Sequence, residues 1–370
     1  MPLTQPTVNY HTKTLKVRVK DKRAKVLSQW AFEVNQVWNA ANAISADYSW
    51  VSIPGVGYMN CNTSEFDINT ELKGIRDERD MRIGAATVQS VVGQHAKSRK
   101  QFKTNKLQWR CSSGSKRALG WVPFKTAGVK LVNGQIRFCG EYFGVWDSYD
   151  LSKYVLGTGS FSQDARGRWY FNTSVKVANE RGAGLTSVGI DLGLKTTATC
   201  SDGLLLERRR ITDGFAKTLA MAQRANKPKR VKSIHAKIKH ARHDAIHKFT
   251  SHMDEHYGAI FVGNVSSKGL VKTKMAKSVL DVGWFTLKTQ LEYKAIARSV
   301  VFAEVNEKHT SQTCSCCGVI SANSPKGRAG LRIREWVCAE CGVLHDRDVN
   351  AARNILRLGH QSLAVGIPVL

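Results

Sequence analysis

Changes in the spacing of apolar and polar positions divide the chain into segments of different kinds. Residues 12–20 alternate apolar and basic side chains, which predicts a half-buried strand with a cationic outer face. Residues 24–105 repeat apolar positions at helical spacing, with a break rich in Gly, Pro and Asn at 53–63. Residues 111–180 hold short β-rich pieces, and the Asn-Gly pair at 133–134 predicts a tight hairpin. We expect a small β-barrel or sandwich, completed by the first strand and interrupted by the helical block.

Beyond residue 184, strand-like and helix-like segments alternate, which is typical of an α/β domain. An apolar strand there ends in Asp191, and the next strand, 196–201, is expected to return antiparallel to it. A carboxylate leaving an apolar strand is costly to bury unless it is paired, and a metal ion is the usual partner. Capping of a turn by Asp191 is the alternative interpretation.

A second candidate carboxylate, Asp348, precedes an amphipathic helical pattern that runs to Leu356. Capping of that helix by Asp346 or Asp348 is the alternative, and Asp346 could also assist Asp348. If one sheet brings Asp191 and Asp348 together, they can bridge two Mg²⁺ ions about 4 Å apart. Such a pair of ions hydrolyses phosphodiesters by activating a water and stabilising the leaving oxygen.

Five of the nine cysteines lie between residues 314 and 341. Four of them form two Cys-x-x-Cys pairs, each followed by Gly, which is the pattern of a closed structural Zn²⁺ site. Cys316 is the spare cysteine, because it is too close to its neighbour in sequence for both to bind comfortably. The predicted zinc ligands are Cys314, Cys317, Cys338 and Cys341.

The formal net charge is +27, with 56 Lys and Arg against 29 Asp and Glu, which indicates a polyanionic partner. A membrane partner is disfavoured because no apolar run approaches the roughly 20 residues that span a bilayer. The first residues show no signal-peptide pattern, so we expect a cytoplasmic, nucleoid-associated protein with reduced thiols. The side chains predicted to bind nucleic acid are Lys97, Arg99, Lys100, Lys103, Arg224, Lys227, Lys229, Arg230 and Lys232.

Four motifs resemble TnpB, the transposon-encoded relative of type V CRISPR effectors and Fanzor. They lie at residues 189–195 (Gly-Ile-Asp-Leu-Gly-Leu-Lys), 290–295, 310–318 and 346–355. The resemblance implies a multidomain α+β protein: a β-barrel wedge domain with an inserted helical recognition domain, then an RNase H-like (RuvC) α/β nuclease domain with a zinc-knuckle insertion. It also implies a prokaryotic, monomeric ribonucleoprotein with a guide RNA from the transposon end. Its Mg²⁺-dependent endonuclease would cut double-stranded target DNA next to a short transposon-associated motif.

The same resemblance suggests domain boundaries. The wedge domain would comprise residues 1–23 and 111–183, and the recognition domain 24–110. The nuclease domain would comprise 184–309, the zinc-binding, target-nucleic-acid-binding insertion 310–345, and the nuclease C-terminal helix and tail 346–370.

One position departs from the family pattern, since Gly263 stands where the family's second-motif glutamate is expected. The strand that ends near Glu307 should lie parallel to and beside the strand at 259–266, and strands are about 4.8 Å apart, so a glutamate there could reach the vacated position. Glu307 is therefore our candidate third metal ligand, with Glu304 and Glu292 as weaker ones. A solvated loop position is the alternative for Glu307.

Two rival functions remain. A guide-dependent DNA-binding repressor that does not cleave is favoured by Gly263 and disfavoured by the retained Asp191 and Asp348. A transposase that cuts and joins transposon ends would need a strand-transfer architecture that the sequence does not display.

Overall fold

The computed structural model describes residues 9–47, 51–54, 57–59, 63–180, 184–207, 211–273, 275–330 and 332–364. The chain separates into two compact units. One is Thr12–Val177, and the other combines the residues up to His11 with those from Ala178 onward. The boundary predicted at 183–184 adjoins residues 181–183, which lie outside the described residues. Within the described ranges, no helix is both long enough and apolar enough to cross a membrane.

The Thr12–Val177 unit is built on one seven-stranded sheet with the order β4-β8-β9-β1-β7-β6-β5. Its first strand lies between β9 and β7, so the expectation that it joins the later strands is confirmed. The predicted hairpin is also confirmed, because Asn133 and Gly134 both have positive φ values, 48° and 70°, between β5 and β6. The strands are β1 (Tyr10–Val19), β4 (Trp121–Phe124), β5 (Val129–Val132), β6 (Gln135–Phe138), β7 (Glu141–Trp146), β8 (Gly159–Gln163) and β9 (Trp169–Ala178).

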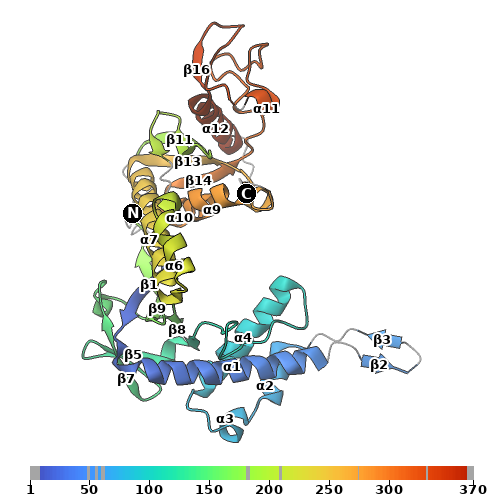
Figure 1. Cartoon of the computed structure of the whole chain (residues 1–370), viewed down its shortest axis with the longest axis vertical. Helices are drawn as coiled ribbons and strands as arrows, with labels where there is room; N and C mark the ends of the chain where they lie inside the picture. Colours follow the sequence, from blue (N-terminus) through green and yellow to red (C-terminus); the bar gives the residue numbers. More distant parts are fainter. Residues whose placement is uncertain are drawn as a thin grey trace, which may run out of the picture. The chain divides into compact units, whose positions relative to one another are not determined.

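The segment between β1 and β4 forms the longer helices of this unit (Figure 1), of which α1 and α4 contact β4. The Trp30 ring meets Phe138 and Phe143 edge-on, with ring centroids 5.5 Å apart in both pairs, and so joins the longest of these helices to the sheet. The remaining elements are η1 (Asp21–Arg23), α1 (Ala24–Asp47), β2 (Val51–Ile53), β3 (Gly57–Met59), α2 (Glu65–Glu71), α3 (Ile75–Glu78), α4 (Ala85–Phe102), η2 (Thr126–Gly128) and η3 (Leu151–Lys153).

The second unit contains a five-stranded sheet with the order β12-β11-β10-β13-β14. Strands β10 and β11 are antiparallel, and β13 and β14 are parallel, as the sequence predicted for these two pairs; β10 is also parallel to β13. Parallel strands bring their carboxyl ends to the same edge of the sheet. The strands of this sheet are β10 (Thr186–Asp191), β11 (Thr196–Cys200), β12 (Leu205–Glu207), β13 (Tyr257–Gly263) and β14 (Val301–Val305). A separate two-stranded sheet consists of β15 (Glu335–Val337) and β16 (Leu344–Asp346).

Helices cover both faces of this sheet. Phe261 and Ala303 face α12, whereas Ile260 and Val262 face α7 and α10, as expected from the alternation of side chains along a strand. Gly189 lets α12 approach closely, because a Cβ there would lie 2.1 Å from the Ala352 carbonyl oxygen. The helices are α5 (Ile211–Gly214), α6 (Ala216–Arg224), α7 (Pro228–His256), α8 (Ser267–Leu270), α9 (Ala276–Val282), α10 (Trp284–Arg298), α11 (Gly327–Gly330) and α12 (Arg347–Ala364).

Candidate active site and metal-binding knuckle

Two strand ends present Asp191 and Gly263 side by side at the carboxyl edge of the five-stranded sheet. Asp191 is the last residue of β10, and Gly263 is the last residue of β13, where Ile190 pairs with Val262. Gly189 faces α12, so Asp191, two residues later on the same strand, faces α12 as well. The sheet therefore directs the first candidate carboxylate toward the beginning of α12.

The Glu307 side chain occupies the space above Gly263. A Cβ atom at Gly263 would lie 2.5 Å from Glu307 Oε2 and 3.3 Å from Glu307 Cβ. Glu307 follows β14 by two residues, and its backbone N–H donates to Asn264 Oδ1 at 3.4 Å. Its carbonyl oxygen accepts from Thr310 Oγ1 at 2.8 Å and from the Thr310 N–H at 3.2 Å. The missing side chain at Gly263 thus leaves room for a carboxylate from the neighbouring strand.

The first turn of α12 contributes the third carboxylate, Asp348. Asp346 Oδ1 accepts the backbone N–H groups of Asp348 and Val349 at 2.9 and 2.8 Å, so Asp346 caps this helix. Asp348 Oδ2 instead lies 2.9 Å from Nη1 of Arg334, with which it forms an ion pair. Asp346 is therefore the residue that caps the helix, whereas the side chain of Asp348 contacts Arg334.

These carboxylates influence one another electrostatically. Burial, followed by the charges of Asp348 and Glu307, raises the pKa of Asp191 to about 7, while Arg347 opposes the shift. Burial also raises the pKa of Glu307, against the opposing charge of Lys288. Like charges are thus crowded at this edge of the sheet, although the oxygen atoms of the three carboxylates do not all lie within 4.8 Å of one another.

The two weaker glutamate candidates lie on the other side of the sheet. Glu304 pairs with Val262, which faces α7 and α10, and its Oε2 lies 2.6 Å from Lys288 Nζ on α10. Glu292, also on α10, lines a cavity of about 330 Å³ together with Glu304 and Lys288. Neither glutamate shares the α12 face with Asp191, which leaves Glu307 as the best placed of the three.

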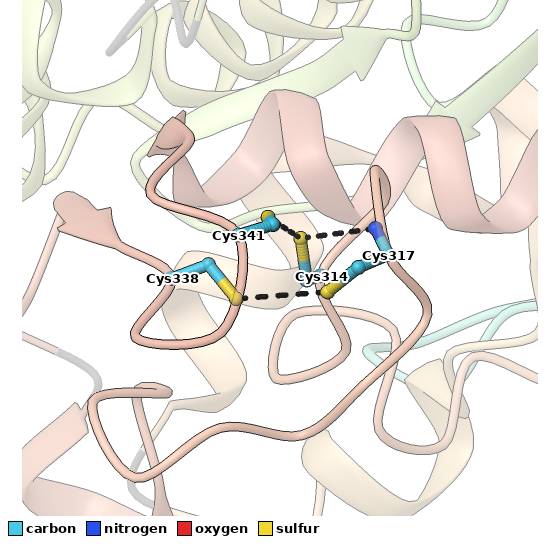
Figure 2. A group of neighbouring side chains, drawn as sticks. All are labelled: Cys314, Cys317, Cys338 and Cys341. Carbon is cyan, nitrogen blue, oxygen red and sulfur yellow. Dashed lines mark hydrogen bonds between the residues drawn. The ribbon is translucent and has the colours of Figure 1, made fainter.

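The four knuckle cysteines converge, as Figure 2 shows. Their sulfur atoms all lie within 4.8 Å of one another, and within the described ranges no other group of three or more potential ligands does so. Cys314 Sγ is 3.6 Å from Cys341 Sγ, and Cys317 Sγ is 3.7 Å from Cys338 Sγ. These separations exceed the roughly 2.05 Å of a disulfide. They match the edge, about 3.8 Å, of a tetrahedron with Zn–S bonds of 2.3 Å. The cluster therefore fits zinc.

The two halves of the knuckle repeat one hydrogen-bonding pattern. In the first half, the Cys314 N–H donates to the Val319 carbonyl at 2.9 Å, and the Gly318 N–H donates to the Cys314 carbonyl at 2.9 Å. The second half repeats both bonds at the same spacings. The Cys338 N–H donates to the Val343 carbonyl at 3.0 Å, and the Gly342 N–H donates to the Cys338 carbonyl at 2.9 Å. Both glycines have positive φ, 78° and 70°, which explains why Gly follows each Cys-x-x-Cys pair.

Sequence reasoning missed the residues that attach the knuckle to α12. Asn350 and Asn354 each donate through Nδ2 to the carbonyl oxygens of Thr310 and Thr313, at distances from 2.7 to 3.3 Å. Buried His345 places Nε2 3.0 Å from Cys314 Sγ. Asn350 and Asn354 are four residues apart, within the last of the four motifs, so they lie on the same side of the helix. This spacing could have identified them as a pair that contacts a neighbouring segment.

The predicted phosphate-binding side chains differ in exposure. Lys97, Lys100 and Lys103 are exposed, but Arg99 is buried and donates from Nη2 to the Thr63 carbonyl oxygen. Arg99 therefore does not belong to the exposed basic surface of this structure, because helix α4 turns this position toward the core. The five predicted cations around the start of α7 are all exposed: Arg224, Lys227, Lys229, Arg230 and Lys232.

Three kinds of comparison show which known proteins this chain is similar to. Residues 284–355 match the family model "Cas12f1-like, TNB domain", which covers α10, β14 and the cysteine knuckle. A predicted RNA-guided DNA endonuclease from Streptomyces pristinaespiralis is 32% identical over 56% of this chain and 54% of its own length. Another, InsQ from Escherichia coli K12, is 29% identical over 65% of this chain and 66% of its own length. The chain thus matches between about half and two thirds of the length of these relatives.

A solved structure has a similar fold over most of the chain. The Cas12f1 chain of a Cas12f1–sgRNA–target DNA complex aligns with a TM-score of 0.59 and 13% identity, covering 94% of this chain and 98% of that one. The fold is thus mixed α/β with several sheets, similar to that of this Cas12f1 chain. The chain is thus similar to proteins named RNA-guided DNA endonuclease and TnpB-like, in agreement with the resemblance of its motifs.

Proposed function

We propose that this protein is an RNA-guided DNA endonuclease. It would use a guide RNA from a transposon end to cleave double-stranded DNA beside a short transposon-associated motif, by two-metal phosphodiester hydrolysis. The names of its relatives and its charge of +27 support this proposal. The bacterial source of those relatives supports a cytoplasmic, nucleoid-associated ribonucleoprotein, which we propose contains one copy of the chain.

The observation that carries the proposal is the position of the Glu307 side chain in the space above Gly263. A pair of Mg²⁺ ions needs a third carboxylate beyond Asp191 and Asp348 to balance charge and hold the second ion. Glu307 would supply it from the next strand, on the same face of the sheet. The loss of the usual glutamate is thus compensated one strand away.

Each carboxylate has a separate role in this proposal. Asp191 would hold both ions, and with a pKa near 7 it must release a proton before it binds them at neutral pH. Asp348 would exchange its ion pair with Arg334 for a metal ion, so the knuckle segment that carries Arg334 can influence the site. Bound Mg²⁺ would polarise the scissile phosphate and make water a better nucleophile at neutral pH.

The domain layout is also part of the proposal. Residues 1–23 and 111–183 would form the wedge, 24–110 the recognition domain, 184–309 with 346–370 the RuvC nuclease, and 310–345 the target-nucleic-acid-binding insertion. Cys314, Cys317, Cys338 and Cys341 would hold one structural Zn²⁺ ion, supported by sulfur separations near 3.7 Å. Zinc would hold the two halves of the knuckle together. Asn350 and Asn354 on α12 would hold the segment 310–313, which leads into the knuckle, near the carboxylates.

The second candidate is an RNA-guided DNA-binding protein that does not cleave, and Gly263 favours it. One experiment separates the two candidates. RNA that copurifies with the full chain is sequenced, a plasmid library containing the matching target beside random sequence is added with Mg²⁺, and cut molecules are sequenced. We expect cleavage beside a short fixed motif, and none with Asp191→Ala, which should still bind target. An unmodified protein that binds its target but leaves it intact would establish the repressor.

A further inference from the structure

The end of helix α7 carries two histidines at the spacing of a helical metal site. His252 and His256 are the first and last residues of the sequence His-Met-Asp-Glu-His, and α7 ends at His256. Residues four apart lie on the same side of a helix, and two histidines at this spacing with a glutamate between them are a pattern of zinc-binding helices. The two ring centroids are 4.0 Å apart, and the ring planes differ by 29°. The imidazoles therefore lie side by side.

The separation of the two rings suits a transition-metal ion. Two nitrogen ligands of a tetrahedral zinc ion are about 3.3 Å apart, because each Zn–N bond is about 2.05 Å long. Rings whose centroids are 4.0 Å apart reach that separation of nitrogen atoms by tilting toward each other. Imidazole nitrogen is also a preferred ligand of Zn²⁺, Cu²⁺ and Ni²⁺.

A hydrogen bond leaves one ring nitrogen of His256 available as a ligand. His256 Nδ1 is 2.9 Å from the backbone carbonyl oxygen of His252. A carbonyl oxygen can only accept, so Nδ1 carries the proton, and in the neutral ring Nε2 keeps its lone pair. Histidines that bind metals usually hold their other nitrogen by such a bond, which fixes the orientation of the ring. The His256 side chain is exposed, so an ion can reach it.

The charges near the pair favour a cation. The C-terminal end of a helix carries a partial negative charge, and both histidines lie in the last five residues of the 29-residue helix α7. Half-buried His252 lines a cavity of about 260 Å³ together with Lys248. Lys248 Nζ lies 2.9 Å from Asp244 Oδ2, so its positive charge is paired within the helix.

The glutamate of the pattern already has a partner. Glu255 Oε1 lies 3.4 Å from Arg298 Nη2, and Asp254 Oδ2 lies 2.9 Å from Arg298 Nε. In zinc hydrolases with this pattern, the glutamate serves as a general base. Because Glu255 is paired with Arg298, the arrangement supports binding of an ion but not hydrolysis.

A second pair of histidines on α7 allows an internal comparison. His243 and His247 have the same spacing, but their ring centroids are 4.6 Å apart, and His247 Nε2 lies 3.4 Å from the Tyr293 hydroxyl oxygen. Burial lowers the pKa of both rings, and the positive charge of Lys294 lowers it further. The same charge would repel a metal ion, so this pair is less suited to bind one.

We propose that His252 and His256 form a second transition-metal site, which takes Zn²⁺ through one nitrogen of each ring and completes its coordination with water. With two protein ligands instead of four, this site binds zinc more weakly than the cysteine knuckle and fills only when zinc is added. The ion joins the last two turns of α7 directly before β13. The inference does not rest on the proposed nuclease function.

The test uses the untagged full chain in excess Mg²⁺, dialysed against rising concentrations of free Zn²⁺, with bound zinc measured by elemental analysis. We expect the zinc content to rise from about one to about two ions per chain. His252→Ala and His256→Ala should each weaken the second site at least about tenfold, since even the loss of a ligand's hydrogen-bonding partner costs about 10–100-fold. Cys338→Ser should lose the tighter site and keep the weaker one.

His243→Ala is the matched control and should take up the second zinc ion like the unmodified protein. A second measurement needs no variant: diethyl pyrocarbonate acylates accessible imidazoles, and added zinc should protect His252 and His256 but not His243. The proposal is overturned if the unmodified protein takes up no second zinc, or if both alanine variants bind it with unchanged affinity. Equal protection of His243 would mean adventitious zinc on surface histidines only, which would also overturn it.

Discussion

The substitution Gly263→Ala examines the space that the candidate active site depends on. An alanine Cβ would lie 2.5 Å from Glu307 Oε2, whereas ordinary contact begins at 3.4 Å, so the carboxylate must move by about 0.9 Å. The atom in the way is the tip of a flexible side chain, and the fold should therefore tolerate the change. A misplacement of about 1 Å in a catalytic group can cost about 100-fold in rate.

We therefore expect Gly263→Ala to slow target cleavage on the order of 100-fold while thermal stability stays close to that of the unmodified protein. The assay is single-turnover cleavage of target plasmid by the RNA-loaded protein in Mg²⁺, with DNA binding measured in parallel. Gly214→Ala is the control, because no atom lies within 4 Å of a Cβ at Gly214. A Gly263→Ala protein that cuts at the normal rate would refute the placement of Glu307 above Gly263.

The double variant Gly263→Glu, Glu307→Ala moves the carboxylate back to the position that the family pattern expects. It should regain part of the activity that Glu307→Ala alone loses, because the new side chain starts from the strand next to Asp191. Failure of the double variant to exceed Glu307→Ala would mean that the two positions do not serve the same metal ion.

Three further predictions concern the metal sites and the basic surface. Cys338→Ser should lose the roughly one zinc per chain found by elemental analysis, whereas Cys316→Ser should keep it; equal zinc in both would reject the assignment. Without metal, Asp191 binds a proton in the folded protein up to a pKa of about 7 but in the unfolded chain only to near 3.8. Stability should therefore fall as pH rises through that interval, and Asp191→Asn or added Mg²⁺ should flatten the fall in the thermal midpoint. Lys229→Glu with Arg230→Glu should weaken binding to all DNA sequences alike and lower the salt slope, which a purely solvated surface would not do.

The sequence predicted those parts of the fold that depend on local pattern. Alternation along β1 and the Asn-Gly turn at 133–134 specify a strand and a hairpin through backbone preferences alone. The cysteine cluster could also be predicted from local sequence, because the spacing within each Cys-x-x-Cys pair and the glycine after it are typical of a zinc knuckle. The proximity of Glu307 to Gly263 could also be predicted, because neighbouring parallel strands end at the same edge of a sheet.

Contacts between distant side chains could not be predicted in this way. The burial of Arg99 depends on which side of α4 meets the core, and a basic run gives no sign of that. The Lys288–Glu304 pair and the Arg334–Asp348 pair each join segments whose approach is set by packing of the whole unit. The knuckle bonds from Asn350 and Asn354 are likewise long-range. Both asparagines are buried, and α12 holds them against the knuckle.

The most direct test of the central claim is target cleavage by Glu307→Gln in saturating Mg²⁺, with DNA binding measured in the same sample. Glutamine keeps the size of the side chain and removes only its negative charge, so folding and target binding should be unchanged. Glu304→Gln is the matched control, since Glu304 lies on the opposite face of the same strand region and pairs with Lys288. We predict that Glu307→Gln binds target and leaves it uncut while Glu304→Gln still cuts. Normal cutting by Glu307→Gln would contradict the account.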